Sequence, residues 1–412
     1  MAKKKAEKKR AVKEKVAAGQ TLPAGATKKQ IAKVRKLLNN ESTVDLGCEL
    51  MITLADPAVY EASLKGCGVD AESGRLEVSH LFRHHQEWRT RALIRILGTA
   101  PEGCSLRAED LDQLDLSSVQ GQGVEGTRSQ LAGVYGSLLV SLPEELAGFP
   151  NLKRLSINNT LIRKLPGSLA ELANLEYLSV SFDNRYFSLA YGSGRNRAVL
   201  VTLPRQIGQL KKLKELRLSS NSIKTIPEGI GELESLRELD LSGNPLQALP
   251  KSFGKLAKLE TLDLSNTSLK TLPDSIGDLG SLQSLDLSES KMTELPDAIG
   301  NLKSLRSLDL SESKMTELPD AIGSLKSLRT LSLCNTDVRH LPATIGQLES
   351  LETLSLPDTI QGIPRELGHL ASLSRLEIDD PYGWHDGAEV VARVIRDLCR
   401  QILAMERGHT DA

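Results

Sequence analysis

Residues 259–282 read LETLDLSNTSLKTLPDSIGDLGSL, and the same pattern of leucines, one proline and one glycine returns before and after this stretch. A fixed spacing of 23 residues separates the prolines that mark each copy. A unit of this length, repeated in register, is typical of a solenoid in which each unit forms one turn. The prolines are Pro204, Pro227, Pro250, Pro273, Pro296, Pro319 and Pro342.

Each unit contains two short elements. Leu262, Asp263 and Leu264 alternate apolar and polar side chains, which predicts a strand with its leucines on one face and the aspartate on the other. Pro273 then begins a second segment, since the start of a helix does not need the N–H that proline lacks. Apolar residues recur there every third position, as one face of a short helix or 3₁₀ turn requires. Gly277 lets the backbone pass close to a neighbour.

One turn cannot bury its leucines alone. Stacked turns share a continuous leucine core, and their strands form a parallel sheet. Parallel strands joined by crossover connections predict a right-handed coil. The expected fold class is therefore α/β, a right-handed solenoid with the parallel sheet on its concave face.

The unit L-x-x-L-x-L-x-x-N-x-L-x-x-L-P-x-x-I-G-x-L-x-x-L, seen in residues 213–236, resembles the 23-residue typical leucine-rich repeat. Similar arrays occur in the intracellular plant Ras-group proteins, in the Ras-pathway leucine-rich scaffold of animals and in bacterial proteins, including secreted effectors. The resemblance covers about residues 110–380. It implies protein–protein interaction in the cytoplasm, often in signalling, by a scaffold without catalytic activity.

The remaining segments differ in composition from the array. A basic tail opens the chain, a region with helical periodicity follows it, and an amphipathic helix near 386–405 is expected to cover the end of the leucine core. Two insertions interrupt the period, near 119–137 and 182–197. The expected domains are a disordered tail and linker (1–26), a helical N-terminal domain or cap (27–105), the repeat array of about ten to eleven turns (106–380) and a C-terminal capping helix (381–412).

Composition indicates a globular protein that works inside the cell. The chain has 412 residues, of which 40% are hydrophobic and 25% charged. No apolar run is long enough to cross a bilayer, and the N-terminus lacks the apolar segment of a signal peptide. Five scattered cysteines, odd in number, fit a reduced compartment. We expect a cytoplasmic monomer.

The net charge of −1 is unevenly spread, because eight Lys or Arg residues and two Glu give residues 1–15 a charge of +6. Such a run usually forms a solubilising tail. No aromatic residue interleaves the lysines, which argues against base recognition. A nucleic-acid-associated protein that uses this tail is an alternative.

The outward strand positions should stack in columns about 4.8 Å apart. One column contains Arg217, Asp240, Asp263, Asp286 and Asp309. Our hypothesis is that this acidic stripe receives a basic segment of a protein partner. The alternative is that L-D-L-S is simply what this type of repeat carries there.

A second candidate surface is aromatic. Aromatic residues make up only 3% of the chain, yet five lie close together in and before the second insertion. Tyr, Phe and Arg are enriched at interface hot spots. The alternative is a loop that packs on its own rim. The residues are Tyr177, Phe182, Tyr186, Phe187 and Tyr191.

Three patterns could suggest an enzyme, and none is complete. Gly121, Gly123 and Gly126 match a dinucleotide-binding spacing without a convincing βαβ unit. Three histidines could place two imidazoles one helical turn apart but lack a further metal ligand. Two cysteines have no recognisable catalytic partner. We expect no catalytic residue, metal or cofactor, with an unrecognised activity in residues 27–105 as the alternative. The histidines are His80, His84 and His85, and the cysteines are Cys67 and Cys104.

Overall fold

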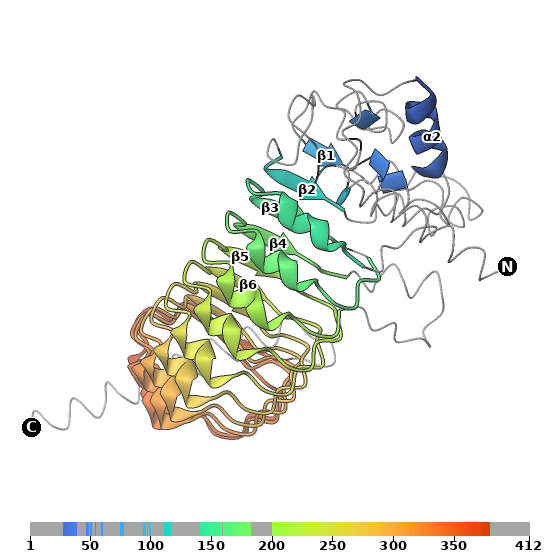
Figure 1. The fold of residues 1–412 in the computed structure, drawn as a ribbon. Helices are drawn as coiled ribbons and strands as arrows, with labels where there is room; N and C mark the ends of the chain where they lie inside the picture. The colour runs from blue at the N-terminus through green and yellow to red at the C-terminus, as the bar shows by residue number, and fades with distance from the viewer. Residues whose placement is uncertain are drawn as a thin grey trace, which may run out of the picture. The chain divides into compact units, whose positions relative to one another are not determined.

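A computed structural model describes thirteen segments of the chain, and these divide between two compact units, residues 1–152 and 153–412 (Figure 1). The second unit contains most of the repeat array. The described residues are 28–38, 47–48, 50–51, 54, 59–60, 75–77, 94–95, 97, 99, 111–116, 141–158, 160–182 and 200–379.

The strands of the second unit follow one another in chain order and pair in parallel, as the period predicts (Figure 1). Matching positions of successive turns pair with each other, so that Leu239, Leu262 and Leu285 are direct neighbours. The strands are β3 (Arg154–Ser156), β4 (Tyr177–Ser179), β5 (Glu215–Arg217), β6 (Glu238–Asp240), β7 (Thr261–Asp263), β8 (Ser284–Asp286), β9 (Ser307–Asp309), β10 (Thr330–Ser332), β11 (Thr353–Leu356) and β12 (Arg375–Ile378).

A 3₁₀ helix follows each proline of the repeat. Pro273 itself has extended backbone angles, and its carbonyl accepts a hydrogen bond of 2.9 Å from the N–H of Ile276. The helix therefore begins one residue after the proline. The helices are η5 (Gly167–Glu171), η6 (Arg205–Gln209), η7 (Glu228–Glu232), η8 (Lys251–Lys255), η9 (Asp274–Asp278), η10 (Asp297–Asn301), η11 (Asp320–Ser324), η12 (Ala343–Gln347) and η13 (Arg365–His369).

The core of this unit lies between the strands and the 3₁₀ helices. Leu262, Leu264 and Ile276 are all buried, and the same positions are buried in neighbouring turns. Each such side chain contributes about 1.5–3 kcal/mol through removal from water. Hydrogen bonds between turns accompany the burial, for example from the N–H of Leu264 to the carbonyl of Asp286 at 2.8 Å.

The repeat glycine lies where two turns approach most closely. An ideal Cβ at Gly277 would lie 2.5 Å from the carbonyl oxygen of Ala298 in the next turn, and one at Gly300 would lie 2.6 Å from that of Ala321. Real Cβ atoms do not come this near to an oxygen. The glycine is required because two successive repeats touch at this point, and not because its own backbone angles need a glycine.

A polar position after each strand joins the turns. Asn244 is buried, and its side chain bonds to the carbonyls of Leu218 and Leu241, at 2.9 Å each, and accepts from the N–H of Ile223 at 3.0 Å. Thr267 occupies the same position one turn later and bonds only to the carbonyl of Leu264 within its own turn. In these two turns the hydroxyl therefore makes fewer bonds than the amide.

The first unit contains α2 (Lys28–Leu38), η4 (Glu144–Gly148) and two short strands, β1 (Arg75–Glu77) and β2 (Gln113–Asp115), which pair in parallel. Helix α2 lies in the region 27–105, where helical periodicity was predicted, and β2 lies in the predicted repeat array, 106–380. Strand β1 was not predicted, and it lies within the region that was expected to be helical. A three-residue strand with one leucine shows too little alternation to be recognised in a sequence.

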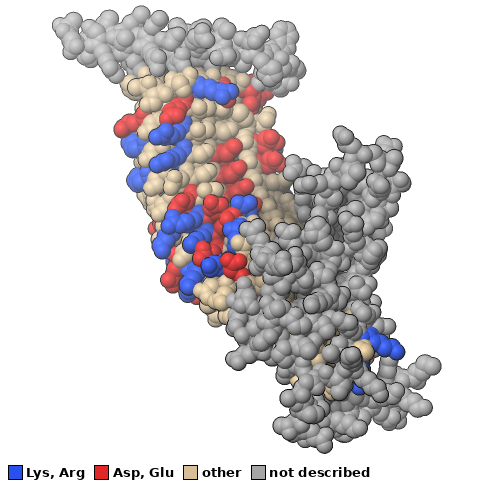
Figure 2. Space-filling model, turned by 90° about the horizontal axis from the view of Figure 1, so that it is seen from above, with Lys and Arg blue, Asp and Glu red and all other residues tan. Residues whose placement is uncertain are grey.

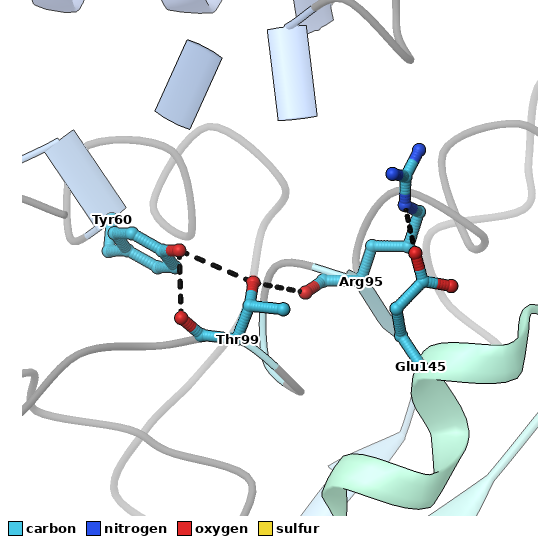
Figure 3. A network of polar contacts seen from close by, with 4 residues as sticks. All are labelled: Tyr60, Arg95, Thr99 and Glu145. Carbon is cyan, nitrogen blue, oxygen red and sulfur yellow. Dashed lines mark hydrogen bonds and ion pairs between the residues drawn. The ribbon is translucent and has the colours of Figure 1, made fainter. Parts of the chain in front are cut away.

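A polar network joins distant parts of this unit (Figure 3). The hydroxyl of Tyr60 donates to the carbonyl of Thr99 at 2.8 Å, and the Thr99 hydroxyl donates to the carbonyl of Arg95 at 2.6 Å. The guanidinium of Arg95 pairs with Glu145 of η4 at 2.6 Å. Since Tyr60 is fully buried, the network satisfies polar groups that would otherwise destabilise the fold.

The glycine contact generates a prediction with an internal control. Gly277→Ala should lower the free energy of unfolding by about 1–3 kcal/mol, because its methyl group overlaps a backbone carbonyl that cannot rotate away. Gly280→Ala, three residues later, has nothing within 4 Å of the new Cβ and should cost nothing or stabilise by up to about 1 kcal/mol. Urea unfolding followed by circular dichroism measures both, and equal effects would contradict the assignment.

Asn244 and Thr267 generate a second prediction. Asn244→Ala should cost about 2–4 kcal/mol, since it leaves several buried backbone groups without partners, whereas Thr267→Ala should cost about 1 kcal/mol. The same unfolding measurement compares them. A cost for Thr267→Ala as large as that for Asn244→Ala would show that the amide does not join the turns.

Candidate functional site

The predicted column of acidic side chains is present on the outward side of the sheet. Asp240, Asp263, Asp286 and Asp309 end strands β6 to β9, and the strand register pairs each with the next. All four side chains are half-buried. We call these four residues the aspartate row. Acidic and basic side chains follow the stack of turns in rows (Figure 2).

Each aspartate of the row is also held by its own turn. Oδ1 of Asp263 accepts a hydrogen bond from the backbone N–H of Ser265 at 2.9 Å and another from the Ser265 hydroxyl at 2.7 Å. The other three make the same pair of bonds with Ser242, Ser288 and Ser311. The serines therefore fix the carboxylates in one orientation, a role that sequence reasoning did not identify.

The second carboxylate oxygen, Oδ2, faces no protein donor within the described part of the chain. No lysine or arginine forms an ion pair with the row there, although eleven such pairs occur elsewhere in the described ranges. Adjacent aspartates at the spacing of paired strands repel by about 0.9 kcal/mol in bulk water. The row therefore retains a negative potential that an external cation could reduce.

Asp263 illustrates the electrostatic cost. Burial raises the pKa of its carboxyl above the ordinary value, and the neighbouring charges of Asp240 and Asp286 raise this pKa further. The hydrogen bonds from Ser265 oppose the shift because they stabilise the ionised form. Burial of this carboxyl therefore disfavours its ionised form in the folded protein.

Two exposed acidic residues lie next to the row. Glu289 and Glu312 follow β8 and β9 and have positive φ angles of 52° and 55°. The corresponding position is Gly243 after β6 and Asn266 after β7, the residue types that adopt this conformation most readily. Sequence reasoning missed both glutamates, because only the strand columns were considered.

An aromatic residue lies between two arginines on strands β3 to β5, which directly precede the strands of the aspartate row. The guanidinium of Arg154 on β3 stacks on the ring of Tyr177 on β4, 3.8 Å from its centroid, and that of Arg217 on β5 lies at 5.9 Å. Arg217 also pairs with Glu215 and, at 3.8 Å, with Glu238. We call Arg154, Tyr177 and Arg217 the arginine–tyrosine cluster. Arg154 was not among the predicted residues.

The other predicted aromatic residues divide into two groups. Phe182 is only 5% exposed, so its ring offers little surface for a partner to contact. Tyr186, Phe187 and Tyr191 lie outside the described residues, as does most of the 182–197 insertion.

The patterns that could have suggested an enzyme also fall outside the described residues. They are Gly121, Gly123 and Gly126, the histidines His80, His84 and His85, and the cysteines Cys67 and Cys104. Within the described segments, no group of three His, Cys, Asp or Glu could hold a metal ion. Over the same segments, no helix has the length and apolar character that a membrane span needs.

Cys334 is the thiol at the C-terminal end of the outward face. Its partial burial raises its pKa to about 11, and the carboxylate of Asp379 raises it as well. A thiol with this pKa is protonated at neutral pH. Cys334 therefore lacks the thiolate that nucleophilic chemistry requires.

Sequence families confirm the repeat. The family described as a leucine-rich repeat region matches residues 297–392, and the family described as leucine rich repeat matches residues 195–246 and 248–292. Among curated proteins, none matches the chain.

Several solved structures are similar to this chain. A leucine-rich repeat protein of Leptospira interrogans is 29% identical over 66% of this chain and 79% of its own, with a TM-score of 0.44. An internalin of Listeria monocytogenes is 16% identical over 72% of this chain and 95% of its own, with a TM-score of 0.44. The ectodomain of the Arabidopsis thaliana receptor kinase GASSHO1/SCHENGEN3 is 23% identical over 66% of this chain and 37% of its own, with a TM-score of 0.45.

The raised pKa of Asp263 predicts a dependence of stability on pH. A carboxyl whose pKa is higher in the folded than in the unfolded protein binds more protons when folded, so stability falls as pH rises through the interval between the two values. Asp263→Asn, which keeps an acceptor oxygen for Ser265, should therefore be more stable than the wild type at pH 7. This advantage should vanish below the ordinary pKa of 3.8.

Urea unfolding at a series of pH values measures this difference. Asp274→Asn is the matched control, since Asp274 belongs to the same turn and is exposed on η9. A stability difference for Asp263→Asn that does not change between pH 3 and pH 7 would contradict the electrostatic account.

Proposed function

The chain is a leucine-rich repeat protein, and from this premise we propose that it is a binding scaffold whose aspartate row receives a basic segment of a protein partner. Leucine-rich repeat arrays commonly serve as protein interaction scaffolds, with an extended face that many small contacts can cover. The observation that carries the proposal is the alignment of four carboxylates, each oriented by its own serine and each without a cationic partner among the described residues.

Small side chains flank the row and leave it accessible. Thr261, Ser284 and Ser307 precede it on strands β7 to β9, and the serines that hold the aspartates follow it. None of these is long enough to cover a neighbouring carboxylate. An extended partner chain could therefore approach until its lysine or arginine groups reach Oδ2.

The carboxylates would contribute to the affinity for the partner in two ways. Charge-assisted hydrogen bonds from lysine or arginine are shorter and stronger than neutral ones. Each bound cation would also relieve repulsion between adjacent aspartates, so that part of the folding cost at Asp263 is recovered on binding. Because exposed charges are screened by salt, the affinity should fall as ionic strength rises.

The proposal includes a non-catalytic role in intracellular signalling, in the cytoplasm. Its support is indirect. The cysteines are scattered rather than spaced as a disulfide framework, and the two in described residues, Cys48 and Cys334, form no disulfide there. Cys334 is protonated at neutral pH, and the described carboxylates are arranged as a row rather than around a reaction centre.

A peptide binding experiment tests the proposal. Fluorescence anisotropy of a labelled peptide of alternating lysine and serine should report binding to the wild-type protein. In the double variant Asp263→Asn/Asp286→Asn the affinity should fall about five- to tenfold, since both charges are lost. Asparagine keeps an acceptor for Ser265 and Ser288, so the loss measures charge rather than local structure.

The control is a second pair of aspartates from the same two turns. Asp274 and Asp297 are exposed at the first positions of η9 and η10, away from the outward strand positions. The variant Asp274→Asn/Asp297→Asn should bind the peptide as the wild type does. Equal losses in both variants, or no loss in either, would rule out the aspartate row as the binding surface.

A further inference from the structure

We propose that the arginine–tyrosine cluster and the aspartate row form one docking track, and that it accepts a partner segment with acidic residues at one end and basic residues at the other. The cluster would take the carboxylates of that segment and the row its cations. This inference rests on the proposed function and extends it to the sign and order of the partner's charges.

The cluster departs from what the repeat requires. The position of Tyr177 in the strand is filled by Glu215 and Glu238 in the next two turns and by small hydroxyl residues in the five turns after them, with the same strand pairing and the same burial of the following leucine. A large ring is therefore not needed to build the turn. The small residues are Thr261, Ser284, Ser307, Thr330 and Thr353.

Arg154 has the geometry of a carboxylate-binding group. Cζ of its guanidinium lies over the Tyr177 ring, 3.8 Å from the centroid, and this contact limits the movement of the group. Within the described part of the chain, no carboxylate forms an ion pair with Arg154. A planar guanidinium held in this way can bind a carboxylate through two parallel hydrogen bonds.

Arg217 plays a smaller part. Glu215 and Glu238 partly balance the positive charge of Arg217. Arg217 therefore attracts an anion only weakly, and its part in the cluster is its contact with the Tyr177 ring. It also lies in register with Asp240, the first residue of the aspartate row. Along the column that contains Arg217 and Asp240, the charge therefore changes sign between two adjacent strands, β5 and β6.

This abrupt change selects the kind of partner. A nucleic acid carries negative charge along its whole length, and any strand longer than the cluster would meet four aspartates and two glutamates. A uniformly basic segment would meet Arg154. A protein segment whose charge changes sign satisfies both ends.

The spacing of strands sets the length of the segment. From Tyr177 on β4 to the middle of the row, between β7 and β8, there are three to four strand spacings, about 17 Å. Extended chain covers this distance with about five residues. The acidic and basic blocks should therefore be centred about five residues apart.

Two peptides and three proteins test the inference. The bipolar peptide has three glutamates, a glycine–serine spacer and three lysines, and the second peptide replaces the glutamates with glutamines. Fluorescence anisotropy should show the bipolar peptide binding the wild type at least about fivefold more tightly than the glutamine peptide. Arg154→Gln should remove this difference, while Arg163→Gln, an exposed arginine of the same turn outside the strands, should preserve it.

The outcomes separate the two proposals. Equal binding of both peptides to the wild type would overturn the docking track and leave the aspartate row intact, because the lysines of both peptides still reach it. Failure of both peptides to bind would overturn the proposed function as well. An equal loss for Arg163→Gln and Arg154→Gln, or tighter binding of single-stranded oligothymidine than of the bipolar peptide, would also overturn the track. Circular dichroism of the variants confirms that each remains folded.

Discussion

The close contact between successive turns is the constraint on which the rest of the structure depends. A strand of three residues and a single turn of 3₁₀ helix cannot remove their own leucines from water, so each turn is stable only against its neighbours. The approach is near enough that Gly277 and Gly300 have no room for a Cβ beside the next carbonyl. Buried asparagines such as Asn244 then join the backbone of one turn to that of the next.

The same stacking creates the electrostatic character of the outward face. Turns that repeat in register place identical positions side by side, so an aspartate repeated in four turns becomes a row of neighbouring carboxylates. The fold partly offsets the repulsion with serine hydrogen bonds to one oxygen of each carboxylate. Burial, with a smaller contribution from the charges of Asp240 and Asp286, still raises the pKa of Asp263 despite its bonds to Ser265.

Departures from the repeat mark positions that the fold itself does not explain. Tyr177 and Arg154 stand at the strand position that holds Glu215 and Glu238 in the next two turns and Thr or Ser in the five turns after them, and the two side chains lie against each other across two strands. Phe182 departs from the repeat in a different way, because its ring is buried. Rarity of a residue type in the chain is therefore a weaker sign of function than its exposure in the folded protein.

The period of 23 residues was enough to predict the parallel strands, the 3₁₀ segments after each proline and the alignment of Asp240, Asp263, Asp286 and Asp309, because these follow from leucine spacing and the burial it requires. Strand β1 and the contact of Arg154 with Tyr177 were not predictable in this way. They depend on which side chains meet after the turns have been brought together, and residues 23 or more positions apart carry no local pattern that records the meeting. The sequence by itself determined that successive turns must stack, and the tertiary structure alone decided which polar groups this stacking satisfies and which it leaves facing outward.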